Sequence, residues 1–116
     1  MQHKSLAEGR WAELSFCEQM ANVGSEVSRT KNWLIKGNEL QAQRAFERCL
    51  ELIYLTLKFA NRSAIYREIC RFKEFFCKAY LEKDIKELEY FDRYCTQFAM
   101  NRALIFSKTH HQIDDR

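Results

Sequence analysis

The sequence predicts an all-α protein, folded as an antiparallel up-down four-helix bundle. The 116 residues contain no proline and only three glycines, so long helices meet almost no residue that would break them. Apolar residues also recur at spacings of three and four through most of the chain, which is the period of an amphipathic helix. Because the links between these apolar stripes are short, consecutive helices are expected to run in opposite directions.

The first long helix is expected to begin at Ser15 and to end near Lys36. Ser15 and Glu18 have the spacing of a capping box, in which each side chain accepts a hydrogen bond from the other residue's backbone amide. Gly37 stands where a left-handed residue commonly ends a helix. Four small residues predict that a neighbouring helix approaches closely, and they are Ala21, Gly24, Ser25 and Ser28.

Three further helices are expected, each with its own cap. Asn38, with Gln41 three residues later, caps the second helix, and the short link from Gly37 makes the first two helices an antiparallel hairpin. Ser63 is expected to cap the third helix, and Asp84, followed by Glu87, the fourth. Six residues lie at the centre of the apolar stripes and are expected to be buried: Phe46, Ile53, Ile69, Phe76, Phe91 and Phe98.

These helices form one domain, since the length suits a single modest core. Residues 15–107 are assigned to the four-helix bundle. Residues 1–14 are expected to be an extension that frays, although Trp11 and Leu14 are apolar enough to fold back and close the end of the bundle. Residues 108–116 lose the helical pattern and are expected to fray as well.

The composition indicates a soluble chain, with 47% hydrophobic and 30% charged residues and a net charge of +3. No apolar run approaches the roughly 20 residues of a membrane span. The first residues also lack an apolar stretch of signal-peptide length. We therefore expect no membrane association and a cytoplasmic location.

Five cysteines are spread along the chain, and each lies within or beside an apolar stripe. An odd number of widely spaced cysteines is typical of buried thiols in a reducing compartment. A zinc site needs ligands two to four residues apart, and no two cysteines have that spacing. Cys70 and Cys77 lie one heptad apart on one helical face, which leaves redox or metal chemistry open.

No enzyme site is expected, because the sequence contains no nucleophile with a base, no metal-ligand cluster and no phosphate loop. His3, His110 and His111 all lie near the chain ends. Arg102 precedes His110 by eight residues, which does not fit the arginine-to-histidine spacing of small bacterial helical ribonucleases. We expect no cofactor, no metal and no small-molecule substrate.

One acidic residue leaves two interpretations open. Glu26 and Arg29 are spaced as a surface ion pair worth a few tenths of a kcal/mol. The small residues Ser25 and Ser28 beside them also allow a buried Glu26–Arg29 network.

Basic residues on the second and third helices support binding of an RNA or DNA backbone as an alternative function. Tyr54 and Tyr66 could stack on bases between them, while glutamates 47, 51, 68 and 74 dilute the charge. The candidate nucleic-acid-binding residues are Arg44, Arg48, Arg62, Arg67, Arg71, Lys73 and Lys78.

Sixteen aromatic residues are more than a four-helix core of this size readily hides. Adjacent apolar residues around Trp33, and around Leu52 and Leu55, must point to different sides of their helices. Because exposed apolar surface commonly marks a partner, we expect these three residues to form an interface. The leading prediction is a non-enzymatic accessory or adaptor protein that forms homo-oligomers and binds a protein partner.

Several segments of the chain resemble a group of short, uncharacterised bacterial proteins of about this length. The segments are residues 19–29 (QMANVGSEVSR), 36–38 (KGN), 45–48 (AFER), 51–56 (ELIYLT), 67–71 and 90–99. The expected layout is also similar to the four-helix proteins encoded in ribosomal RNA intervening sequences and to the accessory proteins of diversity-generating retroelements. That second resemblance implies ring-like oligomers and, for the retroelement proteins, binding to nucleic acid and a reverse transcriptase.

Overall fold

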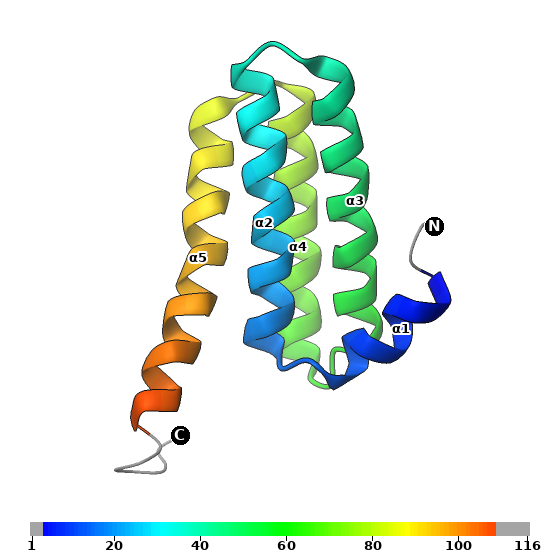
Figure 1. Ribbon diagram of the computed structural model, residues 1–116, viewed down its shortest axis with the longest axis vertical. Helices are drawn as coiled ribbons and strands as arrows, with labels where there is room; N and C mark the ends of the chain where they lie inside the picture. Colours follow the sequence, from blue (N-terminus) through cyan, green and yellow to red (C-terminus); the bar gives the residue numbers. More distant parts are fainter. Residues whose placement is uncertain (1–3, 109–116) are drawn as a thin grey trace.

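The computed structural model describes residues 4–108 of the chain, with side chains for residues 9–98 and Met100. Five α-helices account for this part: α1 (Lys4–Glu13), α2 (Phe16–Ile35), α3 (Glu39–Lys58), α4 (Ser63–Leu81) and α5 (Ile85–Lys108). Helices α2 to α5 lie side by side, and α1 lies beside the end of α3 (Figure 1). The all-α prediction is confirmed for the described residues. His3, His110, His111 and residues 109–116 fall outside them.

Local capping chemistry sets the helix boundaries. The Ser15 hydroxyl accepts from the Glu18 amide at 3.1 Å, and the Glu18 carboxylate accepts from the Ser15 amide at 2.9 Å, so the predicted capping box is present. Asn38 caps α3 through the Gln41 amide, and Asp84 accepts from the Glu87 amide at the start of α5. Gly37 has a φ of +78°, as expected for the residue that ends α2.

The predicted cap of α4 is wrong by one residue. Ser63 is the first residue of the helix, and Arg62, with an extended backbone, occupies the cap position without a side-chain hydrogen bond. The Arg62 carbonyl accepts from the Tyr66 amide at 3.0 Å. The helical hydrogen bonds therefore begin one residue earlier than the Ser63 hydroxyl indicated.

Helix α2 packs closely against both α3 and α5, whereas α4 makes fewer close backbone approaches to its neighbours. Gly24 explains the close packing of α2 against α5, because a Cβ placed at Gly24 would lie 2.6 Å from the Cβ of Cys95 on α5. Because real Cβ atoms do not approach so closely, the glycine is required by the packing of these two backbones. The predicted close approach of a neighbour to the small residues of α2 is confirmed at this position.

Aromatic rings fill the wider spaces around α4. The Phe46 ring of α3 stacks on Tyr80 at a centroid distance of 4.0 Å and lies 5.3 Å from Phe76. Phe72 meets Phe91 of α5 edge to face at 5.4 Å. Each such ring contributes a large buried area and holds the backbones apart. Small residues thus allow α5 to approach α2 closely, whereas large aromatic residues set the distance of α4 from α3 and α5.

The core lies among α2 to α5 and contains most of the residues expected there. Ile53, Ile69 and Phe76 are at most 1% exposed, and Phe91 is 5% exposed. Phe46 and Phe98 are only half-buried and pack against the margin of the core. The prediction of full burial is therefore wrong for these two, because each lies where the aromatic layer reaches solvent.

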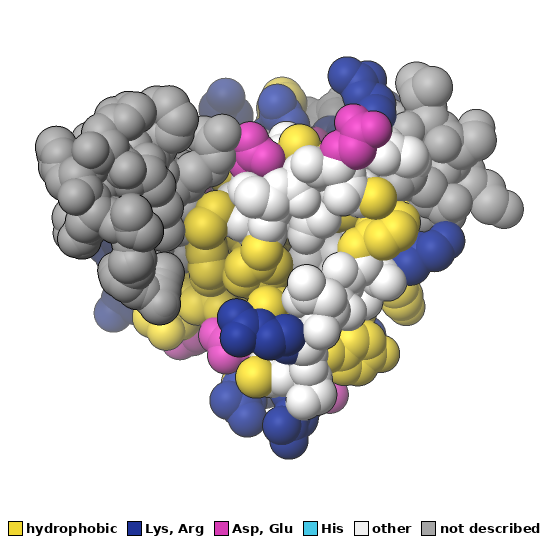
Figure 2. Space-filling model, turned by 90° about the horizontal axis from the view of Figure 1, so that it is seen from below, with side chains coloured by type: hydrophobic (Ala, Val, Ile, Leu, Met, Phe, Trp, Pro, Cys, Tyr) yellow, Lys and Arg dark blue, Asp and Glu magenta, His cyan; other side chains and the backbone are white. Residues whose placement is uncertain are grey.

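Residues 4–13 form helix α1, which corrects the expectation that this part of the chain frays. Trp11 of α1 is buried, and its Nε1 donates to the hydroxyl of Thr56 on α3 at 3.1 Å. The Trp11 carbonyl accepts from Nε2 of Gln19 at 2.9 Å. Figure 2 views the molecule from this end and shows hydrophobic side chains gathered among basic ones. Trp11 thus folds back on the bundle, one of the two arrangements the sequence allowed.

Candidate protein-binding groove

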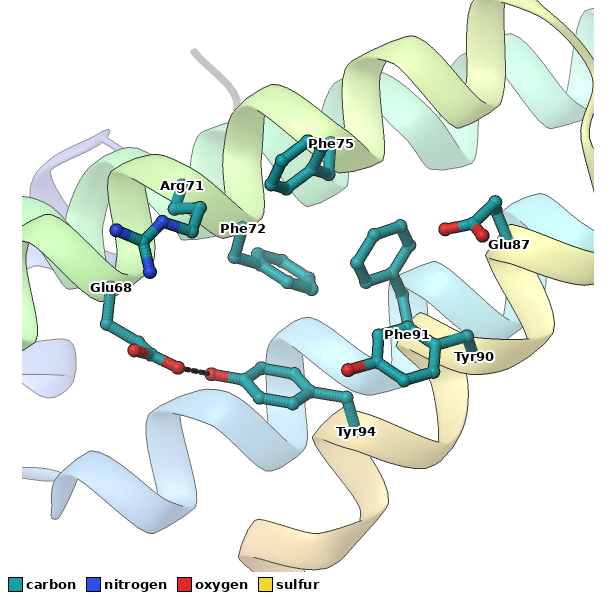
Figure 3. Close-up of a pocket in the computed structure, with 8 residues that line it drawn as sticks. All are labelled: Glu68, Arg71, Phe72, Phe75, Glu87, Tyr90, Phe91 and Tyr94. Atoms are coloured by element: carbon teal, nitrogen blue, oxygen red, sulfur yellow. Dashed lines mark hydrogen bonds between the residues drawn. The ribbon is translucent and has the colours of Figure 1, made fainter.

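A groove of about 390 Å³ runs between α4 and α5. Figure 3 shows its lining side chains converging from the two helices. The lining residues are Glu68, Arg71, Phe72, Phe75, Glu87, Tyr90, Phe91 and Tyr94. Five of these eight side chains are aromatic, so the groove offers apolar surface with a few charges.

The floor and the rim of the groove consist of different rings. Phe72 and Phe91 form the floor, and both are buried. Phe75 and Tyr90 stand at the rim and are 52% and 56% exposed. Phe75 lies off the centre of the α4 stripe, so the helix that buries Phe76 turns Phe75 outward. Two aromatic anchors are thereby exposed next to an apolar hollow.

A hydrogen bond closes one end of the groove. The hydroxyl of Tyr94 donates to the Glu68 carboxylate at 2.6 Å and links α5 to α4 (Figure 3). Burial, assisted by this hydrogen bond to an anion, raises the pKa of Tyr94 well above its usual range. Tyr94 therefore remains a neutral donor. Its role is to fix the geometry of the groove.

The three residues predicted from the sequence to form an interface do not line this groove. Leu55 is 2% exposed and belongs to the same core cluster as Trp11, so its assignment to an interface is wrong. Leu52 and Trp33 are half-buried, and Nζ of Lys36 lies 5.1 Å from the centre of the Trp33 ring. Leu55 precedes Thr56, whose hydroxyl accepts from Trp11 of α1, so Leu55 belongs to the part of α3 on which α1 docks.

The basic residues of α3 and α4 are distributed over different sides of the molecule. Nε of Arg48 lies 3.5 Å from Glu26 of α2, whereas Arg71 lines the groove toward α5. Lys73 lies between α3 and α4, with its Nζ 5.7 Å from the Tyr54 ring. Of the others, Arg44, Arg62 and Arg67 are exposed, and Lys78 pairs with Glu82 at 3.7 Å. Helix phase separates residues that are close in sequence, so they do not form a single patch.

A polar network lies between α2 and α3. Glu26 is 9% exposed, and its Oε2 accepts from Arg29 at 2.8 Å. Its second oxygen is buried and lies nearest to Arg48, at a distance longer than a normal charged hydrogen bond. Glu26 is buried, as the second interpretation required, but the side chain of Arg29 is 56% exposed, so the pair joins a buried carboxylate to a surface guanidinium.

A second ionic link joins α2 to α5. Nζ of Lys31 donates to Glu89 at 2.7 Å and to Asp92 at 2.9 Å. The hydrogen bond that Lys31 donates to Glu89, followed by the one it donates to Asp92, raises the pKa of Lys31 above its ordinary value, although burial opposes this. These two ion pairs hold α5 against α2, the same two helices that approach closely at Gly24.

Cysteines occupy both the core and its margin. Cys49 and Cys95 are fully buried, and the Cys49 thiol faces the Val23 carbonyl at 3.7 Å. Burial raises the pKa of Cys49 far above the usual thiol value and that of Cys95 to about 12. Cys70 and Cys77 are half-buried on α4. No group of three His, Cys, Asp or Glu side chains suited to a metal occurs among the described residues.

We expect the cysteines of the folded protein to differ in their rates of thiol labelling. With a pKa near 12, only about one in ten thousand Cys95 thiols is ionised at pH 8, and its burial adds a steric barrier. Cys49 and Cys95 should therefore react at least about 100-fold more slowly than Cys70. Mass spectrometry of peptides after timed labelling measures each rate. Equal rates before and after unfolding would contradict the burial of the two core thiols.

Hollows also occur elsewhere among the described residues. One, of about 430 Å³, follows the small residues of α2 beside Cys95 and Asp92, and one of about 250 Å³ lies where α1 meets the bundle.

Within the described part of the chain, no helix has the length and apolar character needed to cross a membrane. Comparisons of the sequence with family models and with curated proteins, and of the fold with solved structures, find no match.

Proposed function

We propose that this protein is a non-enzymatic adaptor that self-associates through the α4–α5 groove and binds a protein partner. The observation that carries the proposal is the pair of rim aromatics, Phe75 and Tyr90, which are each more than half exposed beside an apolar floor. Exposed aromatic anchors next to a hollow are typical of the residues that dominate binding energy at protein interfaces. The groove therefore replaces Trp33, Leu52 and Leu55 as the proposed contact surface.

The chemistry of the groove supports binding in preference to catalysis. Of its two tyrosines, Tyr94 is held neutral and donates to Glu68, and no histidine or cysteine is found among the described residues that line the groove. A catalytic site requires a positioned base or nucleophile with a shifted pKa that suits its role. The absence of such a pair among the lining residues supports an adaptor.

We further infer that α2 to α5 constitute an antiparallel up-down four-helix bundle to which α1 is added. The short links and the contacts of α2 with α3 and α5, and of α4 with the same two helices, support this architecture. We also propose a cytoplasmic location, since buried thiols such as Cys49 and Cys95 are suited to a reducing compartment. From the segments that resemble short bacterial helical proteins, we also propose that the chain belongs to that group.

The proposed function is tested by measuring mass in solution. Replacing Phe75 or Tyr90 by serine removes an anchor from the groove without opening the core, because both side chains are largely exposed. Each change should weaken self-association by about 10-fold to 100-fold, as expected for loss of an aromatic hot spot. Sedimentation across a concentration series gives the association constant.

Tyr54→Ser is the matched control, since Tyr54 is 58% exposed but lies on α3, away from the groove. This control should associate like the unmodified chain. Association unchanged by Phe75→Ser and Tyr90→Ser would refute the groove as the contact surface. Tight, salt-dependent retention on RNA or DNA by a monomer would instead support the nucleic-acid alternative.

A further inference from the structure

Helix α1 docks on the C-terminal end of α3. Trp11 is buried there, and its Nε1 donates to the hydroxyl of Thr56, which is also buried. Leu55, the residue before Thr56, is buried in the same apolar cluster as Trp11. A residue that the sequence predicted to form an interface therefore lies in the part of α3 on which another segment of the same chain docks.

The described contacts of α1 with the bundle converge on Trp11. Its ring reaches Thr56 of α3, and its carbonyl accepts from Nε2 of Gln19 on α2 at 2.9 Å. The other residues of α1 whose burial the structure describes are residues 9, 10, 12 and 13, and all four are exposed. Loss of the Trp11 contacts thus removes the buried part of α1 that the structure describes.

The joint between α1 and α2 is short. Leu14 and Ser15 connect the two helices, and the hollow of about 250 Å³ lies between this joint and residues 59–61, which link α3 to α4. Space at this position reduces the packing contacts of the joint. The Ser15–Glu18 capping box begins α2 without any residue of α1. The first turn of α2 can therefore remain formed when α1 undocks.

Segments with few buried apolar contacts open at free energies well below that of global unfolding. We propose that α1 is a releasable strap, which Trp11 holds over an apolar site at the end of α3 and which opens while α2 to α5 stay folded. The closed form hides Leu55 and Thr56, and the open form exposes them. This site is separate from the α4–α5 groove, so the strap controls access to a second contact surface.

Limited digestion of the full chain by trypsin tests whether α1 opens by itself. Trypsin cuts after Arg10, which precedes Trp11, and after Arg48 in the middle of α3, but only where the helix has opened. When opening and closing are fast relative to cleavage, each rate reports the population of the open form. Cleavage after Arg10 should be at least about 100-fold faster than cleavage after Arg48. Equal rates would show that α1 opens only with the whole bundle, and the strap would be refuted.

Two equivalent substitutions test the hydrogen bond that holds the strap. Thr56→Val removes the acceptor of Trp11 and should raise the rate of cleavage after Arg10 at least about 5-fold. Thr30→Val is the matched control, since Thr30 is a fully buried threonine of α2 whose hydroxyl donates to the Glu26 carbonyl. That change affects the open and closed forms of α1 alike, so cleavage after Arg10 should keep its rate. An unchanged rate in Thr56→Val would show that Trp11 does not hold α1 in place.

A fluorescent dye that binds apolar surface, anilinonaphthalene sulfonate, measures exposure of the site. Trp11→Ala removes the buried ring and should leave α1 open, so this variant should bind more dye than the unmodified chain. Trp33→Ala is the control, because Trp33 is only half-buried and lies outside the contacts of α1. Circular dichroism verifies that α2 to α5 remain helical, and Thr56→Val replaces Trp11→Ala if they do not. Dye binding equal to that of the unmodified chain would refute an apolar site beneath α1.

Discussion

Phe76→Ala is expected to lower the free energy of unfolding by about 3–5 kcal/mol. Phe76 is fully buried, and its ring lies 5.3 Å from Phe46 and 5.9 Å from Phe72, so truncation leaves a cavity inside the aromatic layer. A loss of that size is a large part of the roughly 5–15 kcal/mol that stabilises a typical domain. Denaturant titration followed by circular dichroism measures the change.

The neighbouring residue supplies the control. Phe75→Ala removes the same ring from the next position of α4, but Phe75 is 52% exposed. Its loss should cost about 1–2 kcal/mol, because only about half of its surface is buried and no cavity forms inside the core. Similar losses for the two substitutions would show that the orientation of α4 described above is wrong.

Gly24→Ala is expected to destabilise the fold by about 1–2 kcal/mol. The added Cβ would lie 2.6 Å from the Cβ of Cys95, and no flexible side-chain end is available to move aside. Such overpacking costs about 1–3 kcal/mol. Alanine recovers up to about 1 kcal/mol through its better helix propensity. The steric cost outweighs this gain, since relief requires a shift of α5 itself. Thermal unfolding measures the net effect.

A double-mutant cycle with Cys95→Gly isolates this contact. Removing the Cβ of Cys95 frees the space that the methyl group introduced by Gly24→Ala would need, so the two changes together should cost less than the sum of each alone. Gly9→Ala is the comparison, because nothing lies within 4 Å of a Cβ built at Gly9. That substitution should be neutral or slightly stabilising. Additive losses in the cycle would show that Gly24 has no role in setting the distance between α2 and α5.

Local signals in the sequence were sufficient to predict three of the helix caps and most of the core. The Ser15–Glu18 box and the Asn38 cap depend only on residues three positions apart, and both are present. The burial of Ile53 or Phe76 follows from the period of one helix. These features need no knowledge of neighbouring helices, so sequence reasoning reaches them.

The groove, and the burial of a residue predicted to form an interface, depend instead on how the helices pack against one another. Leu55 is buried in the part of α3 on which α1 docks, and the sequence offered that docking, through Trp11 and Leu14, only as one of two arrangements. Phe75 is exposed because the rotation of α4 that buries Phe76 turns Phe75 outward, and the packing of α4 against α3 and α5 sets that rotation. Arg48 and Arg71 belong to different sides of the molecule because each helix has its own rotation. No spacing within one helix records these relations.

The close approach at Gly24 also bears on how the chain is made. About 70 residues separate Gly24 from Cys95, so this close helix pair joins distant parts of the sequence. At a synthesis rate of roughly 5–20 residues per second, the α5-facing side of α2 waits on the order of 4–14 seconds for its partner. Helix α3 follows α2 directly in the chain and is made within that interval. The nascent chain can thus form the α2–α3 hairpin before α5 has been synthesised.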